Sequence, residues 1–140
     1  MKCQGPWRQL PGMLVKLQEY LDKNGLAPTG AASGIYYNTP KEVNPGELRW
    51  EVAYSVASET PESPEDQAGF GIRPMPEVRV AAIVHCGLYR QAGASYSRLE
   101  AWIVQQGLKV CGPAEEVYLS TEISLGAEQE IEIRLPVCSV

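Results

Sequence analysis

Two segments of the chain carry hydrophobic residues at i, i+3 and i+7, the spacing that gathers side chains on one face of an α-helix. These residues are Leu14, Leu17 and Leu21 in the first segment and Tyr96, Leu99 and Ile103 in the second. The first segment begins near Pro11, which the first turn of a helix tolerates, and ends at Asn24-Gly25. The second ends at Gln106-Gly107, the same glycine stop signal. The pattern predicts two amphipathic helices of about three turns each.

Hydrophobic and polar residues alternate in two later segments, 48–56 and 129–137, which predicts a strand in each. The residues that share a face are Leu48, Trp50, Val52, Tyr54 and Val56 in the first strand and Ile131, Ile133 and Leu135 in the second. Extended segments ending at Tyr36 and Tyr118 precede them, and another predicted strand, 78–85, precedes the second helix. The second half of the chain is therefore expected to form a strand–helix–strand–strand unit.

The two halves also resemble each other in sequence. Residues 3–39 align without a gap to residues 85–121 with ten identities, and the stretches CQGPWRQ and HCGLYRQ open the two copies. We interpret this as an internal duplication. In the first copy only Met1-Lys2 stands where the second has its opening strand. Either the chain is shortened there, or another chain or segment fills that sheet position. Because an uncovered sheet edge is a liability that proteins usually cover or pair, we expect a homodimer.

The region between the copies is rich in proline and acidic residues. Residues 57–68 are interpreted as an exposed acidic loop. The whole chain, 1–140, is expected to form one domain, with the first repeat at about 3–56 and the second at about 69–137.

Charge and composition exclude several classes of function. The net charge of -5 argues against a nucleic-acid surface, and no apolar run approaches the roughly 20 residues of a membrane span. The four cysteines form no Cys-x-x-Cys pair and His85 is the only histidine, so no zinc site is expected. No cofactor is expected either. We expect a cytoplasmic protein whose thiols are reduced and mostly buried.

Several motifs, taken in order, resemble the GyrI-like small-molecule-binding domain, the effector-binding domain also found in AraC-type and MerR-type regulators. The family pattern His-x-Gly-x-Tyr is met by His85, Gly87 and Tyr89, although Leu88 stands where the family usually has proline. The later elements of the pattern are met by Gly112, Pro113, Tyr118, Pro136 and Val137.

This resemblance implies an α+β fold of two strand–helix–strand–strand modules related by a pseudo-twofold, with antiparallel sheets and a central ligand cleft. It also implies a hydrophobic, often cationic ligand held by aromatic walls and a carboxylate. In the last strand, Glu132 faces away from Ile131 and Ile133, and Glu51 is its counterpart in the first copy. A carboxylate beside aromatic rings suits an organic cation.

The candidate ligand-binding residues are Glu132, Glu51, Tyr118, Tyr36, Tyr89 and Trp7. Each has a plainer interpretation. Glu132 could be a solvated residue paired with Arg134 or Arg49, and the aromatic residues could be framework.

Three functions stay open at this point. The first is a binding protein for a hydrophobic cation, without direct DNA binding, that sequesters or senses a drug or toxin. The second is a hydrolase of electrophilic small molecules, with Glu132 or Glu51 as base and Tyr89 or Tyr118 as acid. The third is a protein-interaction module such as a gyrase modulator. The sequence contains no recognisable catalytic set, so we expect binding rather than catalysis.

Overall fold

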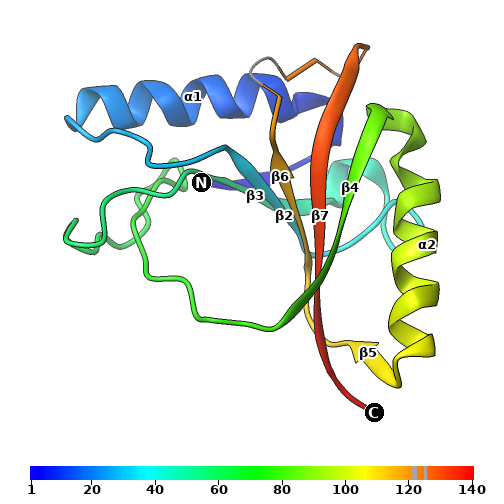
Figure 1. Ribbon diagram of the computed structural model, residues 1–140. Helices are drawn as coiled ribbons and strands as arrows, with labels where there is room; N and C mark the ends of the chain where they lie inside the picture. Colours follow the sequence, from blue (N-terminus) through cyan, green and yellow to red (C-terminus); the bar gives the residue numbers. More distant parts are fainter. Residues whose placement is uncertain (121–122, 125) are drawn as a thin grey trace. The chain divides into compact units, whose positions relative to one another are not determined.

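The computed structural model describes residues 1–120, 123–124 and 126–140 of the chain (Figure 1). The chain divides into two compact units, Met1–Pro76 and Glu77–Val140. Each unit combines antiparallel strands with one long helix, so the fold is α+β, as predicted.

In the first unit, β3 (Arg49–Ala53) pairs antiparallel with β1 (Lys2–Gln4) on one side and with β2 (Ser33–Tyr36) on the other. Helix α1 spans Leu10–Lys23, after a 3-10 turn at Trp7–Gln9, and a second 3-10 turn occupies Pro45–Glu47. The predicted leucine stripe is confirmed, since the buried residues of α1 are Leu10, Leu14, Leu17 and Leu21.

The prediction that the first copy lacks its opening strand is wrong. Lys2–Gln4 form β1, and the ladder extends one residue further because Val52 and Met1 exchange backbone hydrogen bonds of 3.0 and 2.8 Å. The strand is short, and its residues Lys2 and Gln4 are exposed, so its hydrophobic pattern is too weak to be recognised.

A later segment of the same chain covers the outer edge of β1. The backbone N–H of Lys2 donates to the carbonyl oxygen of Gly69 at 3.1 Å. The ring of Phe70 stacks on Tyr20 of α1 with centroids 4.6 Å apart. We call residues 63–73 the return segment, since Ser63 and Ile72 bridge its two ends. Residues 69–76, expected to begin the second repeat, therefore pack within the first unit.

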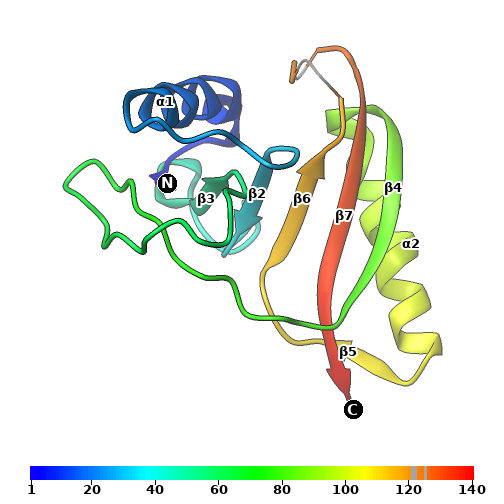
Figure 2. The ribbon, with the colours of Figure 1, turned by 60° about the vertical axis from the view of Figure 1, so that its left-hand side comes forward.

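In the second unit, β7 (Glu128–Ser139) is the central strand. It pairs antiparallel with β4 (Val80–Leu88), β6 (Ala114–Tyr118) and β5 (Leu108–Val110). A 3-10 turn at Tyr89–Gln91 leads into α2 (Ala92–Gln105), which runs alongside β4 and β7 (Figure 2). Burial alternates along β7 as the sequence predicted, with Ile131, Ile133 and Leu135 in the core.

The two units use the same strand register at matching positions. In the first, Trp50 pairs with Cys3 and with Tyr36. In the second, Ile131 pairs with the aligned residues, His85 and Tyr118. The aligned glycines of the opening stretches also share a backbone conformation, with φ of 127° at Gly5 and 144° at Gly87. The sequence similarity between the halves thus corresponds to equivalent local structure.

Three of the four cysteines are accessible, contrary to expectation. Only Cys3 is buried, whereas Cys86 and Cys111 are exposed and Cys138 is half-buried. Cys86 projects from the face of β4 opposite to the buried His85, because side chains alternate along a strand.

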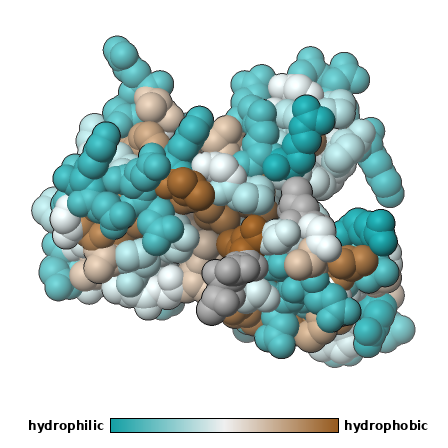
Figure 3. Space-filling view, turned by 90° about the horizontal axis from the view of Figure 1, so that it is seen from above, coloured by the Kyte–Doolittle hydropathy of each residue, from teal (hydrophilic) through white to brown (hydrophobic). Residues whose placement is uncertain are grey.

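Hydrophilic side chains cover most of the surface seen in Figure 3, and hydrophobic residues show between them as small patches. Within the described part of the chain, no helix has the length and apolar character needed to cross a membrane.

Candidate functional site

A buried carboxylate, Glu116 of β6, lies on the face of the second sheet that packs against α2. Its Cα partner is Ile133 of β7. Two residues along the same strands, Tyr118 pairs with Ile131, which is also the partner of His85. His85 contacts Ser95 of α2. Residues paired directly across two strands, and alternate residues along one strand, share one face of a sheet, so Glu116 lies on the same face as His85. Glu116 is only 4% exposed.

Three tyrosine hydroxyls donate hydrogen bonds to this carboxylate. Tyr89, from the turn before α2, and Tyr118, from β6 itself, donate to Oε1 of Glu116 at 3.0 and 3.1 Å. Tyr96, from the first turns of α2, donates to Oε2. Both carboxylate oxygens are therefore hydrogen-bonded, by side chains from three different elements.

Burial dominates the electrostatics of this cluster. It raises the pKa of Glu116 because the charged form loses its hydration, and the hydrogen bonds from Tyr96, Tyr89 and Tyr118 only partly oppose this. The pKa of Tyr96 is raised as well, first by burial and then by the charge of Glu116. Among the described residues, no lysine or arginine forms an ion pair with Glu116.

His85, beside this cluster, is held at both ring nitrogens. Its Nε2 lies 2.9 Å from the carbonyl oxygen of Leu88, which can only accept. In the neutral ring Nε2 therefore carries the proton, and Nδ1 accepts from the hydroxyl of Ser95 on α2 at 2.9 Å. His85 therefore links the sheet to α2.

Glu132, the first predicted carboxylate, lies on the opposite face of β7 from Ile131 and Ile133. Its Oε1 accepts from Nε of Arg134 at 2.7 Å, and its side chain is 28% exposed. This arrangement matches the plainer of the two interpretations, a partly solvated carboxylate paired with Arg134.

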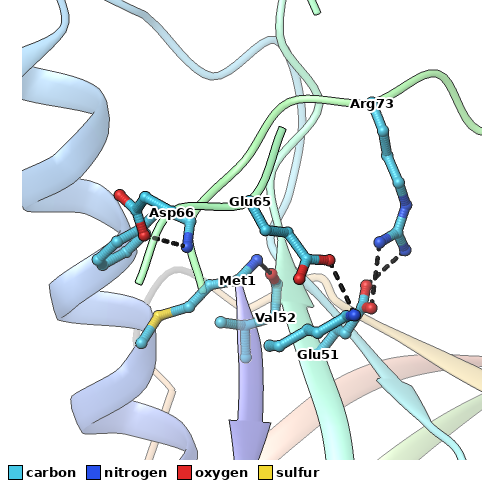
Figure 4. Close-up of polar contacts among 8 residues, drawn as sticks. Met1, Glu51, Val52, Glu65, Asp66 and Arg73 are labelled. Carbon is cyan, nitrogen blue, oxygen red and sulfur yellow. Dashed lines mark hydrogen bonds and ion pairs between the residues drawn. The ribbon is translucent and has the colours of Figure 1, made fainter. Parts of the chain in front are cut away.

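Glu51, the second predicted carboxylate, is buried in the first unit but already has a cationic partner. The two terminal guanidinium nitrogens of Arg73, from the return segment, donate to its two oxygens (Figure 4). Burial alone would raise the pKa of Glu51, but the hydrogen bonds and charge of Arg73, helped by Tyr37, outweigh it and lower that pKa.

The predicted aromatic residues fall into two groups. Tyr89 and Tyr118 meet at Glu116. Trp7 and Tyr36 meet in the first unit, edge to face with ring centroids 5.1 Å apart, and Tyr36 is only 7% exposed. The indole nitrogen of Trp7 is buried and has no hydrogen-bond partner among the described residues.

Sequence reasoning did not identify Glu116 and Tyr96 as site residues, yet a comparison of the two repeats gives a signal for both. In the ungapped alignment, Glu116 stands opposite Gly34 and Tyr96 opposite Leu14. The other two tyrosines of the cluster, Tyr89 and Tyr118, have aromatic counterparts in the first copy. A carboxylate on the helix-facing side of the sheet and a hydroxyl on the helix itself appear in only one copy, and they distinguish the second unit chemically from the first.

Comparison with known proteins agrees with the architecture. Residues 1–137 match the family described as GyrI-like small molecule binding domain. A DNA gyrase inhibitor of Edwardsiella ictaluri (strain 93-146) is 32% identical over 149 residues, which cover 98% of this chain and 88% of the relative.

Solved structures of the same fold are more distant in sequence. The crystal structure of the EcmrR C-terminal domain has a TM-score of 0.78 at 19% identity, covering 99% of this chain and 89% of that one. In the EcmrR–DNA complex the TM-score is 0.77 at 18% identity, and this chain, matched over 98% of its length, spans only 51% of that chain. A hydrolase from Listeria innocua has a TM-score of 0.65 at 14% identity, with 98% of this chain and 84% of that chain covered.

Proposed function

Because the chain belongs to the GyrI-like small-molecule-binding domain family, we propose that its second unit binds a hydrophobic organic cation at Glu116. The observation that carries this proposal is a carboxylate, 4% exposed, whose hydrogen-bond partners are three phenols and which forms no ion pair with a lysine or arginine of the described chain. A buried charge without a counter-ion is costly, and a bound cation removes that cost.

The chemistry of the cluster favours an organic cation over a metal ion. Three tyrosine side chains donate their hydroxyls to the carboxylate, and aromatic ring faces attract cations by about 0.5–2 kcal/mol each. No group of three or more metal-ligating side chains occurs among the described residues. Because Glu116 is buried, a ligand reaches it only after the side chains that cover it move aside.

The proposal is tested by titrating a lipophilic cation, tetraphenylphosphonium, into the wild-type protein and into Glu116→Gln. A charge-assisted contact of about 1.5–3 kcal/mol predicts a loss of roughly ten- to a hundred-fold in affinity. Glu132→Gln is the matched control, since that carboxylate is already paired with Arg134, and it should bind like the wild type. Neutral triphenylphosphine oxide should bind both variants equally. Equal losses for Glu116→Gln and Glu132→Gln would refute the assignment.

The other predicted residues have different roles in this proposal. Tyr89 and Tyr118 orient the carboxylate of Glu116. Trp7 and Tyr36 supply an aromatic wall in the first unit, and the unpaired indole N–H of Trp7 is available to an acceptor on a ligand. Glu51 and Glu132 would bind a cation only if it displaced Arg73 or Arg134.

A hydrolase is the second candidate, favoured by the same carboxylate. A carboxyl group with a raised pKa, hydrogen-bonded to phenols, has the properties of a general acid–base. The catalytic pair would then be Glu116 and Tyr89 rather than Glu132 and Tyr89. Incubation with an epoxide substrate, followed by product mass spectrometry, tests this; turnover unchanged in Glu116→Gln would refute it.

A gyrase modulator is the third candidate, suggested by the relative from Edwardsiella ictaluri. Two acidic residues of the predicted loop are engaged within the chain. Glu65 pairs with Lys2 at 3.0 Å, and Asp66 accepts the backbone N–H groups of Ala68 and Phe70. Only Glu59 and Glu62 would then present charge to a partner. A gyrase supercoiling assay with the Glu59→Gln/Glu62→Gln protein tests their role.

The homodimer and the cytoplasmic location stay predictions. The dimer was predicted from an uncovered sheet edge in the first unit, but Gly69 of the same chain forms a backbone hydrogen bond with that edge. Light scattering at micromolar concentration measures the oligomeric state directly.

A further inference from the structure

The C-terminal end of β7 and the short strand β5 bring two cysteines together. Val110 pairs with Val137 and Lys109 with Cys138. One residue beyond β5, the backbone N–H of Cys111 donates to the carbonyl oxygen of Pro136 at 2.9 Å, which continues the ladder. Figure 2 shows β5 beside the end of β7.

This register places both thiols on one face of the ladder. Cys111 lies opposite Pro136, and Cys138 is two residues further along β7, so the two cysteines are diagonal neighbours. Both are accessible, Cys111 fully exposed and Cys138 half-buried, and both are reduced in this structure.

We propose that Cys111 and Cys138 form an oxidisable dithiol, which hydrogen peroxide closes to a disulfide that ties β5 to the C-terminal end of β7. The Cys111 thiolate attacks one peroxide oxygen, breaks the O–O bond and becomes a sulfenic acid, while the other oxygen leaves as water after protonation. The Cys138 thiolate then attacks that sulfur and releases the hydroxyl as a second water. Two thiols are oxidised and one peroxide is reduced.

The surroundings allow this step. Diagonal neighbours have Cα atoms about 7–8 Å apart, slightly more than in native disulfides, so one cysteine must approach the other. The shift would loosen the Cys111–Pro136 hydrogen bond at the end of the ladder, where β5 contributes only three residues and Gly112 follows. The hydrogen bond with Cys138 raises the pKa of the Cys111 thiol, so the reaction should accelerate as the pH rises above neutral.

The crosslink would act on α2 as well as on the sheet. Strand β5 follows α2 through the turn at Gln106-Gly107. Fixing Cys111 to β7 therefore anchors the C-terminal end of the helix whose first turns carry Tyr96. The segment enclosed by the disulfide contains β6, and with it Glu116.

The test uses the full-length chain with Cys86→Ser, which removes the other exposed thiol and with it a competing reaction. After treatment with hydrogen peroxide, non-reducing peptide mass spectrometry should find a Cys111–Cys138 linked peptide and an intact mass lower by two hydrogen atoms. Further replacement, Cys111→Ser or Cys138→Ser, should abolish the link. The oxidised protein should melt several degrees higher than the reduced protein, since the crosslink restricts the unfolded chain.

Two results would overturn the proposal. One is the addition of oxygen at Cys111 without any linked peptide in the Cys86→Ser protein. The other concerns phenylarsine oxide, a reagent that bridges neighbouring thiols. It should bind one equivalent per Cys86→Ser chain and lose this binding in either serine variant; unchanged binding in both variants would contradict the pairing of these two cysteines.

Discussion

The hydroxyl of Tyr89 lies 3.0 Å from Oε1 of Glu116 and donates to it, although the two residues belong to different elements of the second unit. Tyr89 ends the strand-to-helix junction that the sequence repeats in both halves, whereas Glu116 has no counterpart in the first half. The contact therefore joins a feature common to both units to one that is specific to the second.

Replacing Tyr96 with Phe should destabilise the chain by about 1–3 kcal/mol, because it removes a hydrogen-bond donor from a buried carboxylate. Urea unfolding followed by circular dichroism measures this. Tyr20→Phe is the matched control. Tyr20 is also on a helix, but its ring stacks on Phe70 and the substitution preserves that stacking, so the loss should be below about 0.5 kcal/mol. Equal losses in the two variants would contradict a role for the Tyr96 hydroxyl.

Because of Glu116, the free energy of unfolding should fall as the pH rises above about 4.3, the usual glutamate pKa in an unfolded chain. The pKa of Glu116 is raised in the folded chain, so between the two values the folded state holds more protons than the unfolded state. The decrease ends once the pH exceeds the folded pKa. Unfolding free energies measured from pH 4 to 8 should show this slope in the wild type and lack it in Glu116→Gln. An identical slope in both proteins would place its origin elsewhere.

The ionisation of Glu116 should also make ligand binding depend on pH. A cation binds the ionised carboxylate of Glu116, so the affinity for tetraphenylphosphonium should rise with pH until the carboxyl group is fully ionised. Titration calorimetry at several pH values measures this rise. Affinity that is independent of pH in the wild type, or that varies equally in Glu116→Gln, would argue against this residue as the counter-ion.

Arg73→Met should lower stability at neutral pH by about 1–2 kcal/mol, because it leaves Glu51 buried without its cation while the exposed part of Arg73 is screened by water. The pKa of Glu51 is lowered in the folded chain, so this contribution is present above about pH 4.3 and disappears as the pH falls through the folded pKa. Unfolding experiments at pH 7 and pH 2 compare the two regimes.

The Lys2–Glu65 pair offers the matched control for that substitution. Like the Arg73–Glu51 pair, it joins a strand of the first unit to the return segment, here β1 instead of β3, but its side chains are 60% and 41% exposed. Glu65→Gln should therefore change stability by no more than about 0.5 kcal/mol at pH 7. A loss as large as that of Arg73→Met would mean that burial does not govern the strength of these pairs.

Gly87→Ala should destabilise the chain by about 1–3 kcal/mol, because its φ of 144° is rarely adopted by residues with a side chain. Gly93, six positions along in α2, has open space where a Cβ would lie. Gly93→Ala should instead stabilise the helix by about 0.5–1 kcal/mol. Thermal unfolding of the two variants should therefore shift in opposite directions, and a shared direction would contradict the backbone argument.

The sequence alone determined the helices, the long strands and the two-part organisation. These features depend on periodicity within a segment and on similarity between segments, both of which are local. The alternation along 129–137 predicted which side of β7 is buried, and the CQGPWRQ and HCGLYRQ stretches predicted equivalent strand-to-helix junctions. The opening strand of the first unit escaped notice because a strand of three residues contains too few positions to show alternation.

Only the tertiary structure decided which charges have partners. Glu51, Glu116 and Glu132 are alike in sequence terms, each a carboxylate within a strand. The first is neutralised by Arg73 from 22 residues away, the third by Arg134 on its own strand, and Glu116 is left to three hydroxyl groups. The electrostatics of a buried group depend on side chains brought together by folding, and no pattern along the chain records those distances.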